Sequence, residues 1–533
     1  MKFLSIIILI LQILIVFPNC TCASSSVTNY FLCNSCHQGI EKAGKGHAFQ
    51  CKKCHLPNFD GRELKSHEPI IRNPASPKWQ MVVCAKCHKE EVENVKKSLH
   101  ATMAGIINQT RYLWGAQSVS WPPTYSANGI LKRLPDRKPD LKSPAGLVDD
   151  FLRRKCLRCH ISVQGAKTDG LYRATGCSSC HSIYDNDGLY KGNDPAIDKS
   201  RKGYPRKHGL TADIPTTQCL HCHNSNHVGA DYVGLFQSDF NPIYQEPIAT
   251  GIKPTYGTAY IRLSPDVHFR SGIKCIDCHE KSEIMGDGSV PGTMSEAVKV
   301  SCTKCHRGFS SPGFAQTSEA HRIKQHKKLR CSVCHAKWSF QDYGLSVIFT
   351  SEPSYRKWRH LMYQGDPNIV PLFNRELNKR FPDIPTTPDF ITGKLKQGMW
   401  LMAWRFRRWE YMPLGIDTRG RIAIFRPQYQ YYISTVDTAG NVYLDSVAPQ
   451  RGDGTGIGWA FNPYSPHTIA PAGRSCNSCH GNRVSAGFGI FASSDLDTLH
   501  TVPIKPADPR ARLFTREEKK KLLMPLDTPR AHF

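Results

Sequence analysis

The chain has 533 residues, of which 40% are hydrophobic and 21% charged, and its 70 lysines and arginines outnumber its 44 acidic residues to give a formal net charge of +26. Such an excess would usually suggest a nucleic acid or an anionic membrane as partner. Beyond the first residues, no segment is apolar enough to cross a membrane, so the mature chain is expected to have no transmembrane segment.

Residues 1–23 have the pattern of a secretory signal peptide. Lys2 is followed by a run of about 15 mostly apolar residues, shorter than the ~20 that a spanning helix needs, and then by small residues. Cleavage after Ala23 would remove Cys20 and Cys22. We therefore expect an exported protein that is periplasmic, outer-membrane-associated or extracellular, with an uncleaved membrane anchor as the alternative.

The other 20 cysteines all lie in one repeated pentapeptide, Cys-x-x-Cys-His, which is the attachment signature of c-type haem. Its two thiols form thioethers with one porphyrin, and the next residue brings an imidazole under the iron. A zinc site, a redox dithiol or a disulfide scaffold needs no histidine after each pair. The predicted haem-attaching cysteines are Cys33, Cys36, Cys51, Cys54, Cys84, Cys87, Cys156, Cys159, Cys177, Cys180, Cys219, Cys222, Cys275, Cys278, Cys302, Cys305, Cys331, Cys334, Cys476 and Cys479.

The motifs predict ten covalently attached haem c groups, each with one iron. The predicted proximal iron ligands are His37, His55, His88, His160, His181, His223, His279, His306, His335 and His480. Every haem also brings two propionates, so much of the basic excess is expected to surround carboxylates of the cofactors. A nucleic-acid role is therefore not expected.

Thirteen histidines remain for the ten sixth coordination positions, so nearly every haem could have two histidine ligands. Candidates that lie just upstream of a motif are His47, His268, His326 and His467. Weaker candidates are His67, His100, His208, His227, His321 and His500, whereas His221, His360 and His532 stay unassigned. Methionine ligation through Met103 is an alternative that would raise the potential of one haem.

The spacing of the motifs divides the mature chain into three parts. Residues 24–335 hold nine motifs, so porphyrins should replace much of the apolar core, and mainly short α-helices and irregular loops should wrap around a haem chain. Within this part, residues 89–106 have helical periodicity that could aim His100 at a haem. Residues from about 107 to 150 are punctuated by proline and glycine and predict an irregular connection.

Residues 336–475 lack the motif and form the second part, expected to be a small β-containing haem-free module. "QYQYYISTV", "DTAG" and "NVYLDSV" predict a β-hairpin, and the glycine-rich residues 451–459 predict a plain loop. The module either covers haems or forms a pocket in which arginines bind an anion. Residues 476–533 carry the tenth haem and a C-terminal helix, which a capping box from Thr515 to Glu518 should begin.

The chain resembles the large multihaem c-type cytochromes of anaerobic, metal- and sulfur-respiring microbes. The stretches that carry the resemblance include "SLHATMAGIINQTRYLWGAQ", "DVHFRSGIKCIDCHEKSEIMGDG", "RRWEYMPLGIDTRGRIAIFRPQYQ" and "HTIAPAGRSCNSCH". The resemblance implies an exported electron carrier with closely stacked haems that mostly have two histidine ligands. Such relatives carry a further motif after the "HAKW" region, which this chain lacks, and this puts the route from the ninth to the tenth haem in doubt.

Two functions follow from these features. The first is an electron conduit for anaerobic or extracellular respiration, with a redox protein at the inner membrane as donor and an acceptor farther out, and with a homo-oligomer possible. No catalytic residue is assigned in that case. The alternative is a reductase or oxidase of a small nitrogen or sulfur compound at one haem with an open axial position. The haem of His335 or His480 is the candidate, with Tyr411, Arg408 and His467 nearby.

Overall fold

The computed structural model of the protein describes residues 33–58, 67–226, 228–237, 255–307, 319–339, 341–364, 366–408, 412–487, 491–493 and 501–524. The predicted signal peptide, His227, His500, Tyr411 and the side chain of Arg408 lie outside this description. In the part of the chain that is described, no helix is long and apolar enough to cross a membrane.

Short helices dominate the region up to residue 335. The elements there are α1 (Cys33–Cys36), α2 (Cys51–His55), η1 (Cys84–Lys86), α3 (Lys89–Lys97), α4 (Leu99–Thr102), α5 (Ala104–Leu113), β1 (Tyr125–Ser126), β2 (Lys132–Arg133), α6 (Pro144–Arg154), η2 (Cys156–Cys159), α7 (Ser178–His181), α8 (Thr216–Leu220), β3 (Leu235–Gln237), β4 (Tyr260–Arg262), α11 (Val267–Arg270), α12 (Cys275–Cys278), α13 (Lys281–Ile284), α14 (Met294–Ala297), η3 (Cys302–Lys304), α16 (Glu319–Arg322), η5 (Lys324–Lys328) and α17 (Cys331–His335).

The end of the molecule that contains α1 and α2 has almost no protein core. Among the described residues from 33 to 91, only Ala75 and Gln80 are buried. Helices of four or five residues are not stable by themselves in water, because most of their stability comes from packing. This part of the chain therefore needs something other than its own side chains to pack against.

The helical run predicted for residues 89–106 is present but broken into α3, α4 and the start of α5. Met103 separates the last two with a left-handed φ of 53°. The irregular connection predicted for about 107–150 is wrong at both ends, since α5 continues to Leu113 and α6 begins at Pro144. The Ser143 side chain accepts a hydrogen bond from Gly146 N and proline occupies the first turn, which is a standard helix start.

The region after residue 335 is rich in strands. Its elements are β5 (Gln341–Thr350), α18 (Tyr355–Trp358), η6 (Arg359–Gln364), α19 (Ile369–Glu376), β6 (Thr386–Pro388), β7 (Leu395–Gln397), β8 (Met399–Arg408), β9 (Leu414–Ile416), β10 (Ile422–Gln428), β11 (Tyr431–Val436), β12 (Val442–Val447), β13 (Ala460–Tyr464), η7 (Cys476–Ser478), β14 (Phe491–Ser493), β15 (Thr501–Pro503), β16 (Arg512–Leu513) and α20 (Arg516–Leu523).

Two four-stranded sheets organise this region, with strand orders β12-β11-β5-β8 and β13-β10-β9-β16. The predicted hairpin is confirmed, because β11 pairs antiparallel with β12. β11 also pairs in parallel with β5, which then pairs antiparallel with β8. The capping box at the start of α20 is confirmed as well, with both of its reciprocal hydrogen bonds present.

The largest apolar core lies between α5, α6 and the first sheet. Trp114 stacks on Phe151 with ring centres 5.0 Å apart, and Phe151 meets the edge of Trp400 at 4.9 Å. The Trp400 indole N–H donates to Asp150 on α6 over 2.8 Å. α6 is thereby fixed against the sheet, and it runs directly into η2 and the motif at Cys156.

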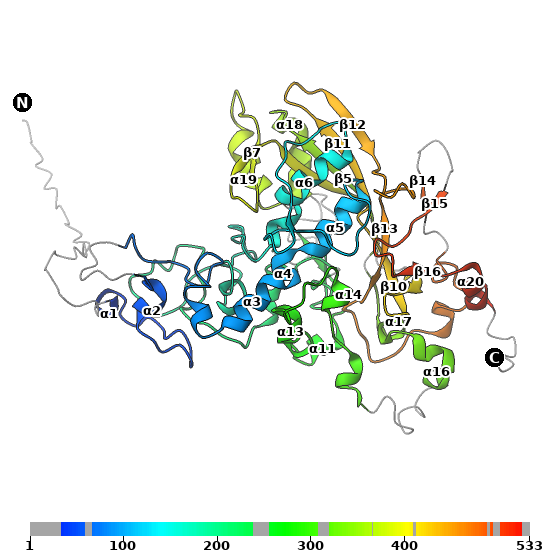
Figure 1. The fold of residues 1–533 in the computed structure, drawn as a ribbon, viewed down its shortest axis with the longest axis horizontal. Helices are drawn as coiled ribbons and strands as arrows, with labels where there is room; N and C mark the ends of the chain where they lie inside the picture. Colours follow the sequence, from blue (N-terminus) through cyan, green and yellow to red (C-terminus); the bar gives the residue numbers. More distant parts are fainter. Residues whose placement is uncertain are drawn as a thin grey trace, which may run out of the picture.

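The motifs are spread from one end of the molecule to the other. Figure 1 shows α1 and α2 at one end of the long axis, and the sheets together with α16, α17 and α20 toward the other end. α20 lies beside the last motif, since Gly481 N donates to Leu522 O over 3.1 Å. The chain thus provides attachment sites along its whole length.

Candidate haem sites

The motif cysteines are free thiols, and all 20 of them lie in the described part of the chain. In that part no three His, Cys, Asp or Glu side chains converge to hold a metal ion. A protein-only zinc cluster would need such a convergence. A haem iron does not, because the porphyrin supplies four ligands and the protein only one or two.

Eight of the ten motif histidines face a second histidine at a nearly constant distance. Every partner is one of the predicted distal candidates. The ring centres of the pairs are separated by 6.4 Å for His37–His67, 6.0 Å for His47–His88, 6.1 Å for His55–His208, 5.9 Å for His100–His223, 6.1 Å for His268–His306, 6.2 Å for His279–His467, 6.1 Å for His321–His335 and 6.1 Å for His326–His480.

This distance fits a single metal ion between two imidazoles. An imidazole nitrogen ligates a transition metal at about 2 Å and the ring centre lies about 1 Å behind it, so two rings on opposite sides of one ion are about 6 Å apart. Side chains in direct contact would be closer, at about 4 Å between heavy atoms. The eight pairs therefore have the spacing that bis-histidine haem iron requires.

The other ring nitrogen of many of these histidines is held by an acceptor, which leaves Nε2 for a metal. Backbone carbonyls accept from Nδ1 of His55, His100, His208, His326 and His335. Carboxylates hold Nδ1 in three others: His37 with Asp194 at 2.7 Å, His268 with Asp266 at 2.8 Å and His279 with Glu283 at 2.5 Å. None of these three acids was predicted from the sequence, because Asp194 is distant from His37 along the chain and Glu283 is brought to His279 by the extended junction between α12 and α13.

Two motif histidines, His160 and His181, face no histidine among the described residues. His181 otherwise resembles the paired ones, because its Nδ1 lies 2.8 Å from Thr211 O. Two of the predicted distal ligands, His227 and His500, lie outside the described residues. His221 is buried and its ring nitrogens contact Gly170 O and Tyr184 O, and His360 is exposed, so neither meets a motif histidine.

The thiols of different motifs lie next to one another in an order that joins nine motifs into one line. Close neighbours are Cys33 and Cys51, Cys84 and Cys177, Cys219 and Cys275, and Cys302 and Cys331. Somewhat weaker electrostatic contacts connect Cys54 with Cys84, Cys180 with Cys219, Cys278 with Cys305, and Cys334 with Cys479. The line therefore runs through the motifs at 33, 51, 84, 177, 219, 275, 302, 331 and 476.

The remaining motif, at Cys156, joins this line from the side. The Cys159 thiol lies 3.9 Å from Cys222 O, and its contact with the Cys222 side chain lowers the pKa of Cys159 to about 6. The motif at Cys219 thus has three neighbours. Because thioether sulfurs sit on the porphyrin edge, adjoining thiols would bring the edges of the haems close together.

A buried positive charge near this junction lacks an acidic partner. Arg173 is 3% exposed and donates only to the backbone carbonyls of Val163, Ala174 and Arg158. A buried charge is costly unless an opposite charge accompanies it. No described carboxylate pairs with Arg173, and a haem propionate is a group that fits this requirement.

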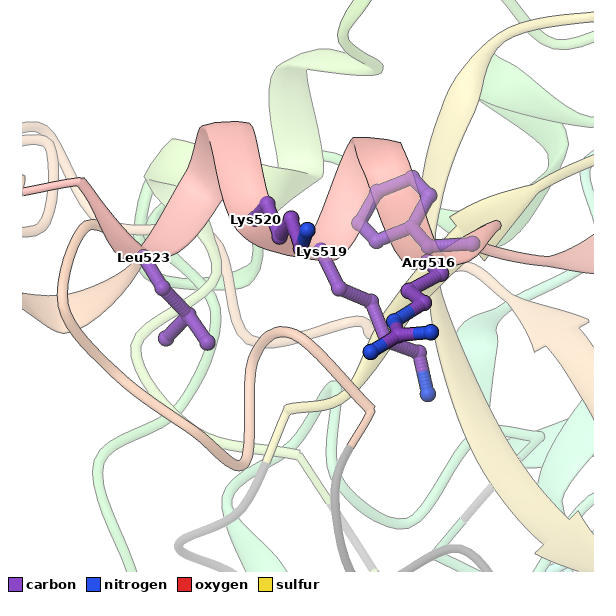
Figure 2. Close-up of a pocket in the computed structure, with 5 residues that line it drawn as sticks. Arg516, Lys519, Lys520 and Leu523 are labelled. Carbon is purple, nitrogen blue, oxygen red and sulfur yellow. The ribbon is translucent and has the colours of Figure 1, made fainter.

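A cationic hollow lies on α20 beside the last motif. Figure 2 shows Arg516, Lys519, Lys520 and Leu523 around it, and its volume is about 470 Å³. Lys519 donates to Gly487 O over 3.3 Å, which ties α20 to the segment that follows His480. Phe514 and Leu523 contribute apolar surface to the lining, and Arg516, Lys519 and Lys520 contribute positive charge.

The haem of His335 or His480 is the predicted candidate for an open axial position, but both histidines face another histidine. His335 faces His321 and His480 faces His326, while His467, expected near such a site, faces His279. His160 and His181 are the two motif histidines that face no described histidine, and of these only His160 has its Nε2 next to a backbone carbonyl, Ala101 O. No family model, no curated protein and no solved structure matches this chain.

Proposed function

We propose that the protein is an exported decahaem c-type cytochrome that conducts single electrons along its length. The resemblance to multihaem cytochromes of anaerobic respiration supports this proposal. The donor would be a redox protein at the inner membrane and the acceptor would lie farther out, in the periplasm, at the outer membrane or outside the cell.

The observation that carries the proposal is the line of nine motifs with adjoining thiols. Electron transfer between haems depends on how closely the porphyrin edges approach. A continuous set of neighbours from Cys33 to Cys479 would provide a path between the two ends of the molecule. A chain that used its haems only as structural cores would not need each to adjoin the next.

The eight histidine pairs support transfer rather than catalysis at most of these positions. The two imidazoles of each pair would both ligate one iron, which would leave no position for a substrate and would keep the ligands the same in both redox states. The carbonyl and carboxylate oxygens that accept hydrogen bonds from Nδ1 hold the rings in place. This arrangement suits a carrier.

The proposal is tested by removing one haem-attachment motif from the middle of the line. Cys275→Ala/Cys278→Ala removes one haem between the motifs at 219 and 302, and we expect the conductance of single molecules held between two electrodes to fall at least tenfold. The matched control is Cys156→Ala/Cys159→Ala, which also leaves nine haems but removes the one beside the line, and should lower the conductance much less. Equal losses in the two variants would contradict the proposed path.

A further inference from the structure

The motif at Cys156 differs from the others in its backbone. In seven other motifs the histidine N–H donates to the carbonyl of the first cysteine over 2.8–3.0 Å, as in His223 to Cys219. In this motif His160 N donates instead to Leu157 O over 3.0 Å. The imidazole therefore leaves the helical turn in a different direction.

The side chain of His160 is engaged differently as well. Its Nε2 lies 2.7 Å from Ala101 O, and the residue is only 4% exposed. Nε2 is the nitrogen that the paired histidines keep for a metal, so ligation by His160 would compete with this backbone hydrogen bond. Among the described residues no histidine lies across from it, whereas His100, the neighbour of Ala101, faces His223.

Charged groups lie beside this motif, with Lys155 buried and Arg158 one-third exposed. Lys155 pairs with Asp366, and Arg158 lies 3.7 Å from the same carboxylate, so that two cations share one acid. The pKa of Asp366 is held well below its usual range, mainly by Lys155 and Arg158 against the opposing effect of burial.

Tyr429, in the connection between β10 and β11, lies near Cys156. It is 8% exposed, packs in the apolar cluster that also includes Cys156, and is near enough to that thiol to interact with it electrostatically. No described residue hydrogen bonds its hydroxyl group. Its φ of 58° is a left-handed conformation that is rare for a bulky residue and commonly marks a functional position.

We propose that the haem held by Cys156, Cys159 and His160 is a side branch that binds a small exogenous anion at its iron, with the Tyr429 hydroxyl as hydrogen-bond donor. The inference rests on the proposed haem line, because electrons would reach this branch through the neighbouring motif at Cys219. Lys155 and Arg158 face the single carboxylate of Asp366, and this excess of cations favours an anionic ligand. A carrier would thus have one exchangeable coordination position.

The test uses the full ten-haem protein with azide and carbon monoxide as probes. In the oxidised protein we expect one high-spin ferric signal for every ten haems, which azide converts to low spin. After reduction we expect one carbon monoxide bound per molecule. No high-spin signal and no carbon monoxide binding, or binding at several haems, would overturn the proposal.

Two variants with nine haems locate the binding position. Cys156→Ala/Cys159→Ala should abolish both probe signals, whereas Cys33→Ala/Cys36→Ala, which removes the haem at the end of the line, should retain them. Retention of the signals in the first variant would refute the assignment. Absence of probe binding in a protein that still conducts along its line would refute this inference and leave the conduit intact.

A variant with all ten haems provides an independent measurement if loss of the branch haem prevents folding. Tyr429→Phe should weaken azide binding tenfold or more, the effect of removing about 1.5 kcal/mol of hydrogen bonding to a charged ligand. Binding of neutral carbon monoxide should change far less. Equal affinity for azide in wild type and in Tyr429→Phe would exclude Tyr429 as the donor. A second variant, Met103→Leu, tests methionine ligation. If carbon monoxide binds only to that variant, Met103 is the native sixth ligand and the proposal is overturned.

Discussion

Replacement of Glu283 by glutamine should raise the reduction potential of one haem selectively. Glu283 accepts a hydrogen bond from His279 Nδ1 over 2.5 Å, and its side chain is 10% exposed. A carboxylate behind an imidazole makes the ring a stronger donor to the metal and stabilises the more positive, oxidised iron. Glutamine preserves the shape of the side chain and removes its charge.

The size of the effect follows from the hydrogen-bond energies. A hydrogen bond to a charged group contributes about 1 to 1.5 kcal/mol more than one to a neutral group. A one-electron potential changes by about 59 mV for each tenfold change in equilibrium, which is about 1.4 kcal/mol. Only the part of this energy that differs between the oxidised and reduced states changes the potential, so we expect the potential of the haem at His279 to rise by up to about 60 mV.

The assay is a spectroelectrochemical titration of wild type and variant, from which the difference isolates the single haem that changes. Glu280→Gln is the matched control, since Glu280 adjoins His279 but its carboxylate pairs with Lys304 in an exposed position. Screening by solvent should keep its effect well below that of Glu283→Gln. A lowered potential, or equal shifts in both variants, would refute the reasoning.

Three other outcomes are expected. The intact mass of the exported protein should correspond to ten covalent haems on a chain that begins near Ser24, and nine or fewer haems would contradict the motif assignment. His268→Ala and His467→Ala should each add one high-spin haem without loss of covalent attachment, whereas an unchanged low-spin spectrum would show that the residue replaced is no ligand. Burial raises the pKa of Asp231 to about 7, so the folded state binds a proton that the unfolded state releases near pH 4, and stability should fall between pH 4 and 7 by up to about 4 kcal/mol. Thermal unfolding of Asp231→Asn at both pH values should lack this decline, and an identical decline in the variant would assign it elsewhere.

The sequence predicted what is local in this protein. The confirmed hairpin and the cap of the last helix depend on a few neighbours, and the proposed attachment chemistry of each motif would likewise lie within five residues. The failed prediction for residues 107–150 has a local cause too, since Ser143 and Pro144 form a helix start that the general abundance of proline and glycine concealed.

Pairing and order could not be predicted, because they depend on contacts between distant segments. Nothing in the sequence near His55 indicates His208 as its partner. The spacing of the motifs along the sequence also does not indicate that the motif at Cys84 adjoins the one at Cys177 and that the motif at Cys156, between them in sequence, lies to the side. The peculiarity of His160 arises from the position of α4 and its Ala101 carbonyl, which only the packed structure defines.

The scarcity of buried side chains between residues 33 and 91 bears on how the protein is made. Among the described residues of this range only Ala75 and Gln80 are buried, so these residues offer no apolar core around which the chain could collapse. Its thiols should stay accessible to the enzymes that attach the cofactor, and folding should follow attachment, as it does where metal binding and folding are coupled. In a cell short of haem, proteases should therefore trim the chain from the end that contains α1 and α2, while the end built on the two sheets persists.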